Sequence, residues 1–177
     1  QAKNYIKELQ AYPNVTILTS TYAAGYYADN WIPLIDAEKM TKMRAKSVIF
    51  ATGGYEQPAV FRNNDVPGVV LATGLLRAAK LYSAMPYKKL VFLVANSWGY
   101  EAALEAVKLG FQIPAIVDLR PVFEMPQAAS ELVAHGINLY RGACVYEVVP
   151  SNDNKSVGAV KIAAFDGKNA GEILTQI

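Results

Sequence analysis

Residues 90–99, LVFLVANSWG, decide the fold of this chain. The stretch opens with six apolar residues, 90–95, which is the length and composition of a strand covered on both faces. Asn96 and Ser97 follow, and both residue types favour the start of a helix, which we expect from about residue 100 to 109. A buried strand, a short turn and a helix form the first half of a β-α-β unit.

The same alternation continues along the chain. A helical pattern over residues 69–82 precedes the stretch, and a strand at 113–119, a helix at 127–134 and a strand at 137–149 follow it. This order predicts a parallel, helix-covered, Rossmann-like sheet with right-handed crossovers. Residues 157–165 alternate in polarity and precede a turn signal at Asp166, so we expect a final antiparallel strand or hairpin there.

The pattern in the first third of the chain is different, because it predicts mostly β-strands after a short N-terminal helix. We expect a helix at 2–12, strands at 15–22 and 31–35, a polar approach at 42–46 and a buried strand at 47–51. A strand, glycine-rich turn and helix, with which a dinucleotide fold begins, are missing. We therefore expect the chain to be a piece of a longer protein.

The predicted fold class is α/β: a Rossmann-like parallel sheet unit plus a partial, mostly β first lobe of a two-domain flavoprotein-type fold. Turn residues dominate 55–68, which we interpret as the connection between the lobes. The predicted division is 1–65 for the partial first dinucleotide-binding lobe and 66–177 for the second lobe.

Composition excludes several function classes. The chain has 177 residues, of which 53% are hydrophobic, and 17 Lys and Arg against 15 Asp and Glu give a net charge of +2, so nucleic acid is not an expected partner. The single Cys144 excludes a disulfide framework and a thiolate zinc cluster, and the single His135 excludes an HExxH site. No apolar run reaches the roughly 18 residues of a membrane span, and the N-terminus is not a signal peptide, so we expect a cytoplasmic protein without a membrane partner.

The second lobe has the layout of a dinucleotide site without its glycines. Asn96 and Ser97 lie at the expected helix N-terminus, and Asp118 stands about 20 positions further on, where an acidic residue binds ribose hydroxyls. The turn contains Trp98 and has no GxGxxG, so a degenerate site is the alternative. In that case Asn96 or Ser97 only caps the helix, and Asp118 with Arg120 is a solvated strand end.

Three further residues have plain structural interpretations. Glu56 is expected to cap or bond a neighbour rather than transfer a proton. His135 is expected at the C-terminal end of a helix, where the dipole favours it. Cys144 lies between apolar neighbours and is expected to be an inert core thiol.

The most specific stretch is residues 51–69, ATGGYEQPAVFRNNDVPGV. Together with the strand at 90–95 and residues 116–120, IVDLR, it resembles the alpha subunit of heterotetrameric sarcosine oxidase, and the resemblance covers most of residues 15–165. It implies that Thr52, Gly53 and Gly54 approach an NAD molecule from one end of its site, while the glycine-rich turn that chiefly binds NAD lies outside this chain.

The resemblance also implies what the complete enzyme does. The parent is an oxidoreductase that converts sarcosine to glycine by oxidative demethylation with peroxide formation. It is a hetero-oligomer that contains FAD and FMN, which these residues alone do not hold. This chain would carry no catalytic residue and would be inactive in isolation.

Two rival interpretations stay open. In the first, the chain is a non-catalytic Rossmann-like scaffold or subunit-interaction module, and its degenerate turn packs against partner subunits. A stand-alone NAD(P)- or flavin-dependent oxidoreductase is disfavoured because the phosphate-binding glycines are missing.

Overall fold

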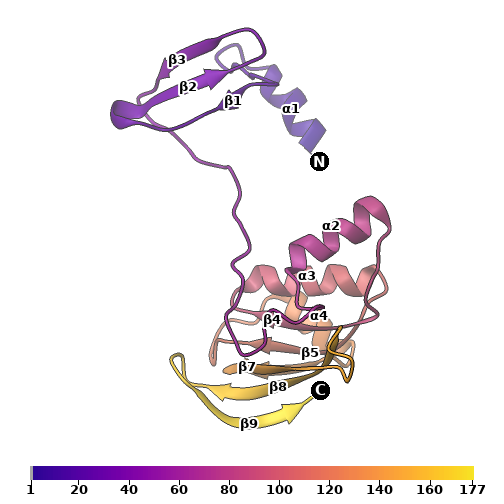
Figure 1. Ribbon diagram of the computed structural model, residues 1–177. Helices are drawn as coiled ribbons and strands as arrows, with labels where there is room; N and C mark the ends of the chain where they lie inside the picture. The colour runs from indigo at the N-terminus through magenta and orange to yellow at the C-terminus, as the bar shows by residue number, and fades with distance from the viewer. Residues whose placement is uncertain (1) are drawn as a thin grey trace. The chain divides into compact units, whose positions relative to one another are not determined.

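The computed structural model describes residues 2–177, which divide into two compact units, one up to residue 54 and one from residue 55 to 177. Each unit is described by itself (Figure 1). The predicted division placed the boundary after residue 65. The structural boundary comes earlier because Glu56 and Arg62 bond to elements of the second unit.

The first unit is a small antiparallel sheet preceded by a helix. Its elements are α1 (Ala2–Gln10), β1 (Tyr22–Ala23), the 3-10 turn η1 (Ala28–Asn30), β2 (Trp31–Ile35) and β3 (Met40–Arg44). The strand order is β1-β2-β3, and Trp31 of β2 pairs with Arg44 of β3. Asp29 and Asn30 have positive φ, which these residue types tolerate in a tight turn.

Three predictions for this unit are wrong. Of the strand expected at 15–22 only Tyr22 belongs to a strand, β1. Residues 42–44 of the expected polar approach belong to strand β3, and the buried strand expected at 47–51 is absent. Ile49 and Phe50 are exposed. A buried strand needs neighbouring strands to satisfy its backbone, and the described residues of this unit offer none to residues 47–51.

The second unit has three layers (Figure 1). A parallel sheet lies in the middle, three helices cover one of its faces, and an antiparallel sheet covers the other. Its elements are α2 (Ala72–Tyr82), β4 (Lys89–Val94), α3 (Ser97–Lys108), β5 (Gln112–Asp118), α4 (Gln127–Ala134), β6 (Asn138–Arg141), β7 (Ala143–Pro150), β8 (Val157–Phe165) and β9 (Ala170–Gln176).

The parallel sheet has the order β4-β5-β6, which confirms the β-α-β-α-β prediction. One expected strand, 137–149, is instead two strands in different sheets. The break falls at Gly142, which has φ +56 and whose added Cβ would lie 3.1 Å from Pro121. Alternation alone cannot locate such a break because both halves are apolar at the same period.

Two core clusters lie on the two faces of the parallel sheet. The helix side includes Phe92, Tyr100 and Ile116, and the antiparallel-sheet side includes Val117, Val145 and Ile162. The predicted hairpin is present as β8 and β9, joined at Asp166 and Gly167. Within residues 2–177, no helix is long and apolar enough to cross a membrane.

Candidate functional site

The candidate site of the second unit lies where β4 and β5 end and α3 begins. Asn96 is the N-cap of α3, and its side-chain oxygen accepts a hydrogen bond from the Gly99 amide at 3.2 Å. Ser97 is the first residue of the helix, and Trp98 follows it with 85% of its surface exposed. Of the two residues predicted as possible caps, Asn96 and Ser97, it is therefore Asn96 that caps α3.

Gly99 lets the helix approach the strand closely. A Cβ added there would lie 2.5 Å from Cγ1 of Val94, the last residue of β4. In dinucleotide-binding folds one glycine serves this packing, whereas others let the backbone reach the pyrophosphate. The packing role is present at Gly99, and counting back from it in G-x-G-x-x-G, the positions of the other two glycines hold Val94 and Asn96.

Asp118 is the only charged residue among the described residues that is buried, with 0% of its surface exposed. Its Oδ2 accepts hydrogen bonds from the Tyr100 hydroxyl at 2.6 Å and from Nη2 of Arg120 at 2.7 Å. Its Oδ1 accepts from the backbone amide of Arg120 at 2.8 Å and from Nε of Arg120 at 3.0 Å. The carboxylate thus accepts four hydrogen bonds, which is its full capacity.

This network sets the charge state of the site. Burial by itself would raise the pKa of Asp118, but hydrogen bonds from Arg120 and Tyr100 hold it below its ordinary value. Burial and the bond to Asp118 raise the pKa of Tyr100. The interpretation of Asp118 as a solvated strand end is wrong, because its internal partners replace water completely.

An aromatic ring covers the network. The guanidinium of Arg120 lies 4.2 Å from the centre of the Phe123 ring, and the Tyr100 ring centre lies 5.8 Å from it. Arg141 reaches the same ring at 5.9 Å. Sequence reasoning missed Tyr100 and Phe123, since no spacing in the sequence indicates that a helical tyrosine and a loop phenylalanine meet at the end of β5.

The predicted residues of the first unit lie in an extended segment. Thr52, Gly53 and Gly54 are exposed and belong to no helix or strand. Gly53 has φ +77, a conformation that favours glycine, and no atom comes within 4 Å of a Cβ added at Gly53 or Gly54. Their part in NAD binding stays a prediction.

Residues 55–71, which carry most of the distinctive sequence, form a connection that we call the strap. Glu56 accepts hydrogen bonds from the amides of Ala72 and Thr73, at 2.9 and 2.8 Å, and from the Thr73 hydroxyl at 2.7 Å. Helix α2 has no side-chain cap at its own N-cap residue, so the distant Glu56 supplies one. The expectation that Glu56 bonds a neighbour is confirmed.

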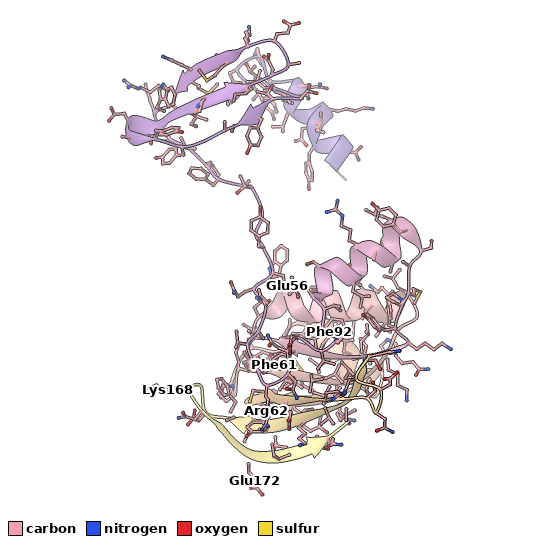
Figure 2. The ribbon with its side chains drawn as sticks, viewed as in Figure 1. Glu56, Phe61, Arg62, Phe92, Lys168 and Glu172 are labelled. Atoms are coloured by element: carbon pink, nitrogen blue, oxygen red, sulfur yellow. The ribbon has the colours of Figure 1, made fainter. Side chains whose placement is uncertain are left out.

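The middle of the strap is fixed to β7 (Figure 2). Arg62 exchanges backbone hydrogen bonds with Tyr146 and Val148, and its Nε lies 3.2 Å from Glu147. Asn63, at φ +62, donates its side-chain amide to the Val148 carbonyl at 2.9 Å. The residues that make the stretch distinctive therefore have structural roles in the second unit.

The two remaining single residues behave as expected. His135 is the C-cap of α4, and its amide donates to the last carbonyls of that helix. Cys144 is a free, half-buried thiol in β7, and burial raises its pKa, which makes it less reactive. The described residues contain no group of three or more His, Cys, Asp or Glu side chains that could hold a metal ion.

Comparison with solved structures gives the class of fold. The chain superposes on a thioredoxin reductase from T. acidophilum with a TM-score of 0.53 and 18% identity, covering 86% of this chain and 47% of that one. A NAD-dependent persulfide reductase from A. fulgidus matches with a TM-score of 0.50 and 18% identity over 95% of this chain and 31% of that one. The fold is that of the pyridine nucleotide-disulfide oxidoreductases.

Comparison with curated proteins narrows this class. The chain is similar to sarcosine oxidase subunit alpha of Rhizobium meliloti, with 31% identity in an alignment of 134 positions that covers 68% of this chain and 14% of that protein. The same subunit of Corynebacterium sp. strain P-1 is 27% identical over 94% of this chain and 18% of its own length. No family model matches the chain. The resemblance to sarcosine oxidase subunit alpha is thus confirmed, and the chain spans less than a fifth of the length of these relatives.

Proposed function

We propose that this chain is part of the alpha subunit of a sarcosine-oxidising enzyme, and that its second unit is a scaffold without a dinucleotide of its own. The proposal that the second unit binds no dinucleotide rests on the hydrogen bonds of Asp118. A ribose-binding carboxylate must keep free acceptor positions for hydroxyl groups, whereas this one gives all four to Tyr100 and Arg120.

The turn of the second unit supports the same proposal. Bringing a pyrophosphate to a helix N-terminus requires glycines that let the backbone approach it. Trp98 stands in this turn instead, and Asn96 uses its side chain to cap the helix. The close packing of α3 on β4 is nevertheless kept through Gly99, so the unit keeps the packing of a dinucleotide fold without the glycines that let the backbone approach a phosphate.

The reaction belongs to the complete enzyme. Sarcosine, oxygen and water would give glycine, a one-carbon unit at the oxidation level of formaldehyde, and hydrogen peroxide, with the electrons passing through FAD or FMN held elsewhere in the hetero-oligomer. This chain contributes no catalytic residue. NAD would bind in the alpha subunit, with Thr52, Gly53 and Gly54 at one end of its site.

The first experiment is thermal unfolding of residues 1–177 with NAD, NADP or FAD at about 100 times a micromolar dissociation constant. A site in this chain would add roughly 2.7 kcal/mol of stability, which raises the midpoint by about 5 to 10 °C in a chain of this size. We expect no shift with any of them. A shift with NAD that Asn96→Ala abolishes would show that the second unit is a nucleotide site and would contradict the proposal.

The second experiment uses the complete enzyme. Gly53→Val places a side chain where φ is +77, and we expect it to weaken NAD binding by about tenfold or more. Trp98→Ala, in the second unit, should leave NAD affinity unchanged. Production of glycine and peroxide from sarcosine by the unmodified enzyme tests the assigned reaction, and its absence would overturn that assignment.

A further inference from the structure

The carboxyl edge of the parallel sheet is built from the ends of all three of its strands. Val94, Asp118 and Arg141 end β4, β5 and β6, and they pair in register, so they form one row. Neighbouring strands lie about 4.8 Å apart, so this row spans about 10 Å. The turn before α3 and the loop after β5 leave the sheet at the same edge, and their side chains lie around this row.

Two apolar side chains at this edge are exposed to solvent. Trp98, in the first turn of α3, is 85% exposed, and Val122, in the loop after β5, is 87% exposed. Neither residue belongs to a core cluster of the second unit. Exposed apolar side chains gathered at one place mark surfaces that bind another protein, and tryptophan is enriched among the residues that carry most of the energy of such contacts.

A guanidinium without an ion-pair partner lies at the same edge. Asp118 neutralises Arg120, whereas no carboxylate among residues 2–177 pairs with Arg141, Glu124 of the nearby loop included. The ring of Phe123 lies 5.9 Å from the Arg141 guanidinium and 4.2 Å from that of Arg120. This cation–π contact restricts the Arg141 side chain before any partner binds, which lowers the entropy that binding costs.

We propose that the carboxyl edge of the parallel sheet docks another subunit of the enzyme. The docking segment places apolar side chains against Trp98 and Val122 and a carboxylate against Arg141, because those are the chemical groups that complement this surface. In dinucleotide folds the same edge is the ligand crevice, and a scaffold that binds no dinucleotide leaves it open to a partner. The inference rests on the proposed function, in which the chain is part of a multi-subunit enzyme, and the relatives that it matches are named as alpha subunits.

The test is the rate at which hydroxyl radicals oxidise Trp98, followed by mass spectrometry in three preparations: the 177-residue chain, the complete alpha subunit and the assembled enzyme. We expect equal rates in the first two and a rate several-fold lower in the assembled enzyme, because interface residues of this kind are shielded from water. Equal rates in all three would overturn the proposal. Protection already present in the alpha subunit alone would overturn it in favour of another part of that subunit, and protection of the short chain that rises with its concentration would do so in favour of a second copy.

Two aromatic residues at opposite ends of the sheet give matched variants of the alpha subunit. Trp98→Ala should weaken its affinity for the partner subunits by about thirtyfold. Tyr82→Ala should leave the affinity unchanged. Tyr82 is 75% exposed and ends α2, close to Lys80, which pairs with Glu105 toward the end of α3 that lies away from Trp98. Both variants should unfold at the midpoint of the unmodified subunit, and equal losses of affinity would contradict docking at the carboxyl edge.

Charge reversal tests the predicted carboxylate of the partner. Arg141→Glu should slow association of the subunits by about tenfold at low salt, with a smaller effect at high salt, because salt screens the attraction. Lys108→Glu is the control, since this exposed lysine ends α3 about 15 Å from Trp98 along the helix. An association rate that Arg141→Glu leaves unchanged would overturn the proposed ion pair.

The docking proposal and the proposed function fail in different ways. An assembled enzyme that oxidises sarcosine while Trp98 stays accessible contradicts docking alone. An enzyme with protected Trp98 and no activity toward sarcosine contradicts the assigned reaction alone. The NAD affinity of the alpha subunit is a third measurement: Trp98→Ala should leave it unchanged while it weakens assembly, and a loss of NAD affinity would show that this edge binds the nucleotide instead of a subunit.

Discussion

Asp118 is the buried charge around which the end of β5 is organised. Its partners come from two residues: Tyr100 on α3 donates its hydroxyl, and Arg120, just after β5, donates both its backbone amide and its side chain. Only the spacing of Asp118 from the turn could be read in the sequence, and the spacing is the same whether the carboxylate binds ribose or is bonded internally. The difference depends on Tyr100, a contact between residues 18 positions apart.

The pH dependence of stability should report this carboxylate. Its pKa in the folded chain is lower than in the unfolded chain, where it is about 3.9. The stabilisation is therefore complete above the unfolded value and is lost as the pH falls through the lower, folded value. Asp118→Asn should destabilise the chain by about 2 kcal/mol at pH 7, and by less below pH 4. Urea unfolding between pH 3 and 7 measures this. The exposed Asp65→Asn is the control, and an equal loss at both ends of the pH range would contradict the assignment.

Gly99 provides a second test at this scale. Gly99→Ala inserts a methyl group 2.5 Å from Val94, between α3 and β4. We expect a net loss of about 1 to 3 kcal/mol, despite the better helix propensity of alanine.

Gly74→Ala is the matched control for this substitution. It lies in α2 with no atom within 4 Å of the added Cβ, so we expect a gain of up to about 1 kcal/mol. Chemical denaturation of both variants measures the change in the free energy of unfolding. If both substitutions stabilise the chain, α3 and β4 are not packed so closely at Gly99 that an added methyl group is unfavourable.

At the scale of elements, the second unit could be predicted well because each helix and strand carries its own signal. Helix α4 begins and ends where the sequence predicts, and β4 and β5 fall within one residue of prediction. The residues 47–51 carry the same apolar signal and form no strand, because pairing depends on neighbours that these residues lack within the described chain. A local pattern gives a strand's tendency to form, and its partners decide whether it does.

The cap that Glu56 provides for α2 is a prediction about two elements, the strap and the helix. Glu56→Ala leaves the Ala72 and Thr73 amides without their acceptor and should cost about 1 to 2 kcal/mol. It should also speed protease cleavage within residues 55–71, because the strap loses one of its attachments. Thermal unfolding and mass spectrometry of the cleavage products measure both effects. Glu101→Ala, an exposed glutamate on α3, should change neither, and an unaffected strap in Glu56→Ala would contradict this role.

At the scale of the whole molecule, the two units differ in how much core they hold. Apart from Pro33, the buried apolar side chains of the described residues run from Leu75 to Ala163, all in residues 55–177. Among residues 4–54 only Pro33 is buried, and large side chains such as Tyr22, Ile49 and Phe50 are exposed. A 54-residue unit is marginal even with a good core, because small domains bury a smaller fraction of their surface.

This difference predicts that residues 55–177 fold alone and residues 1–54 do not. The larger piece should unfold cooperatively, with an enthalpy of roughly 80 kcal/mol from its length, and the smaller should show no cooperative transition and should bind a hydrophobic dye. Calorimetry and dye fluorescence on the two separate pieces measure this. Cooperative unfolding of 1–54 would mean that its sheet is stable without burying those side chains. Failure of 55–177 to unfold cooperatively would contradict the prediction that the two core clusters on the faces of its parallel sheet hold this unit together.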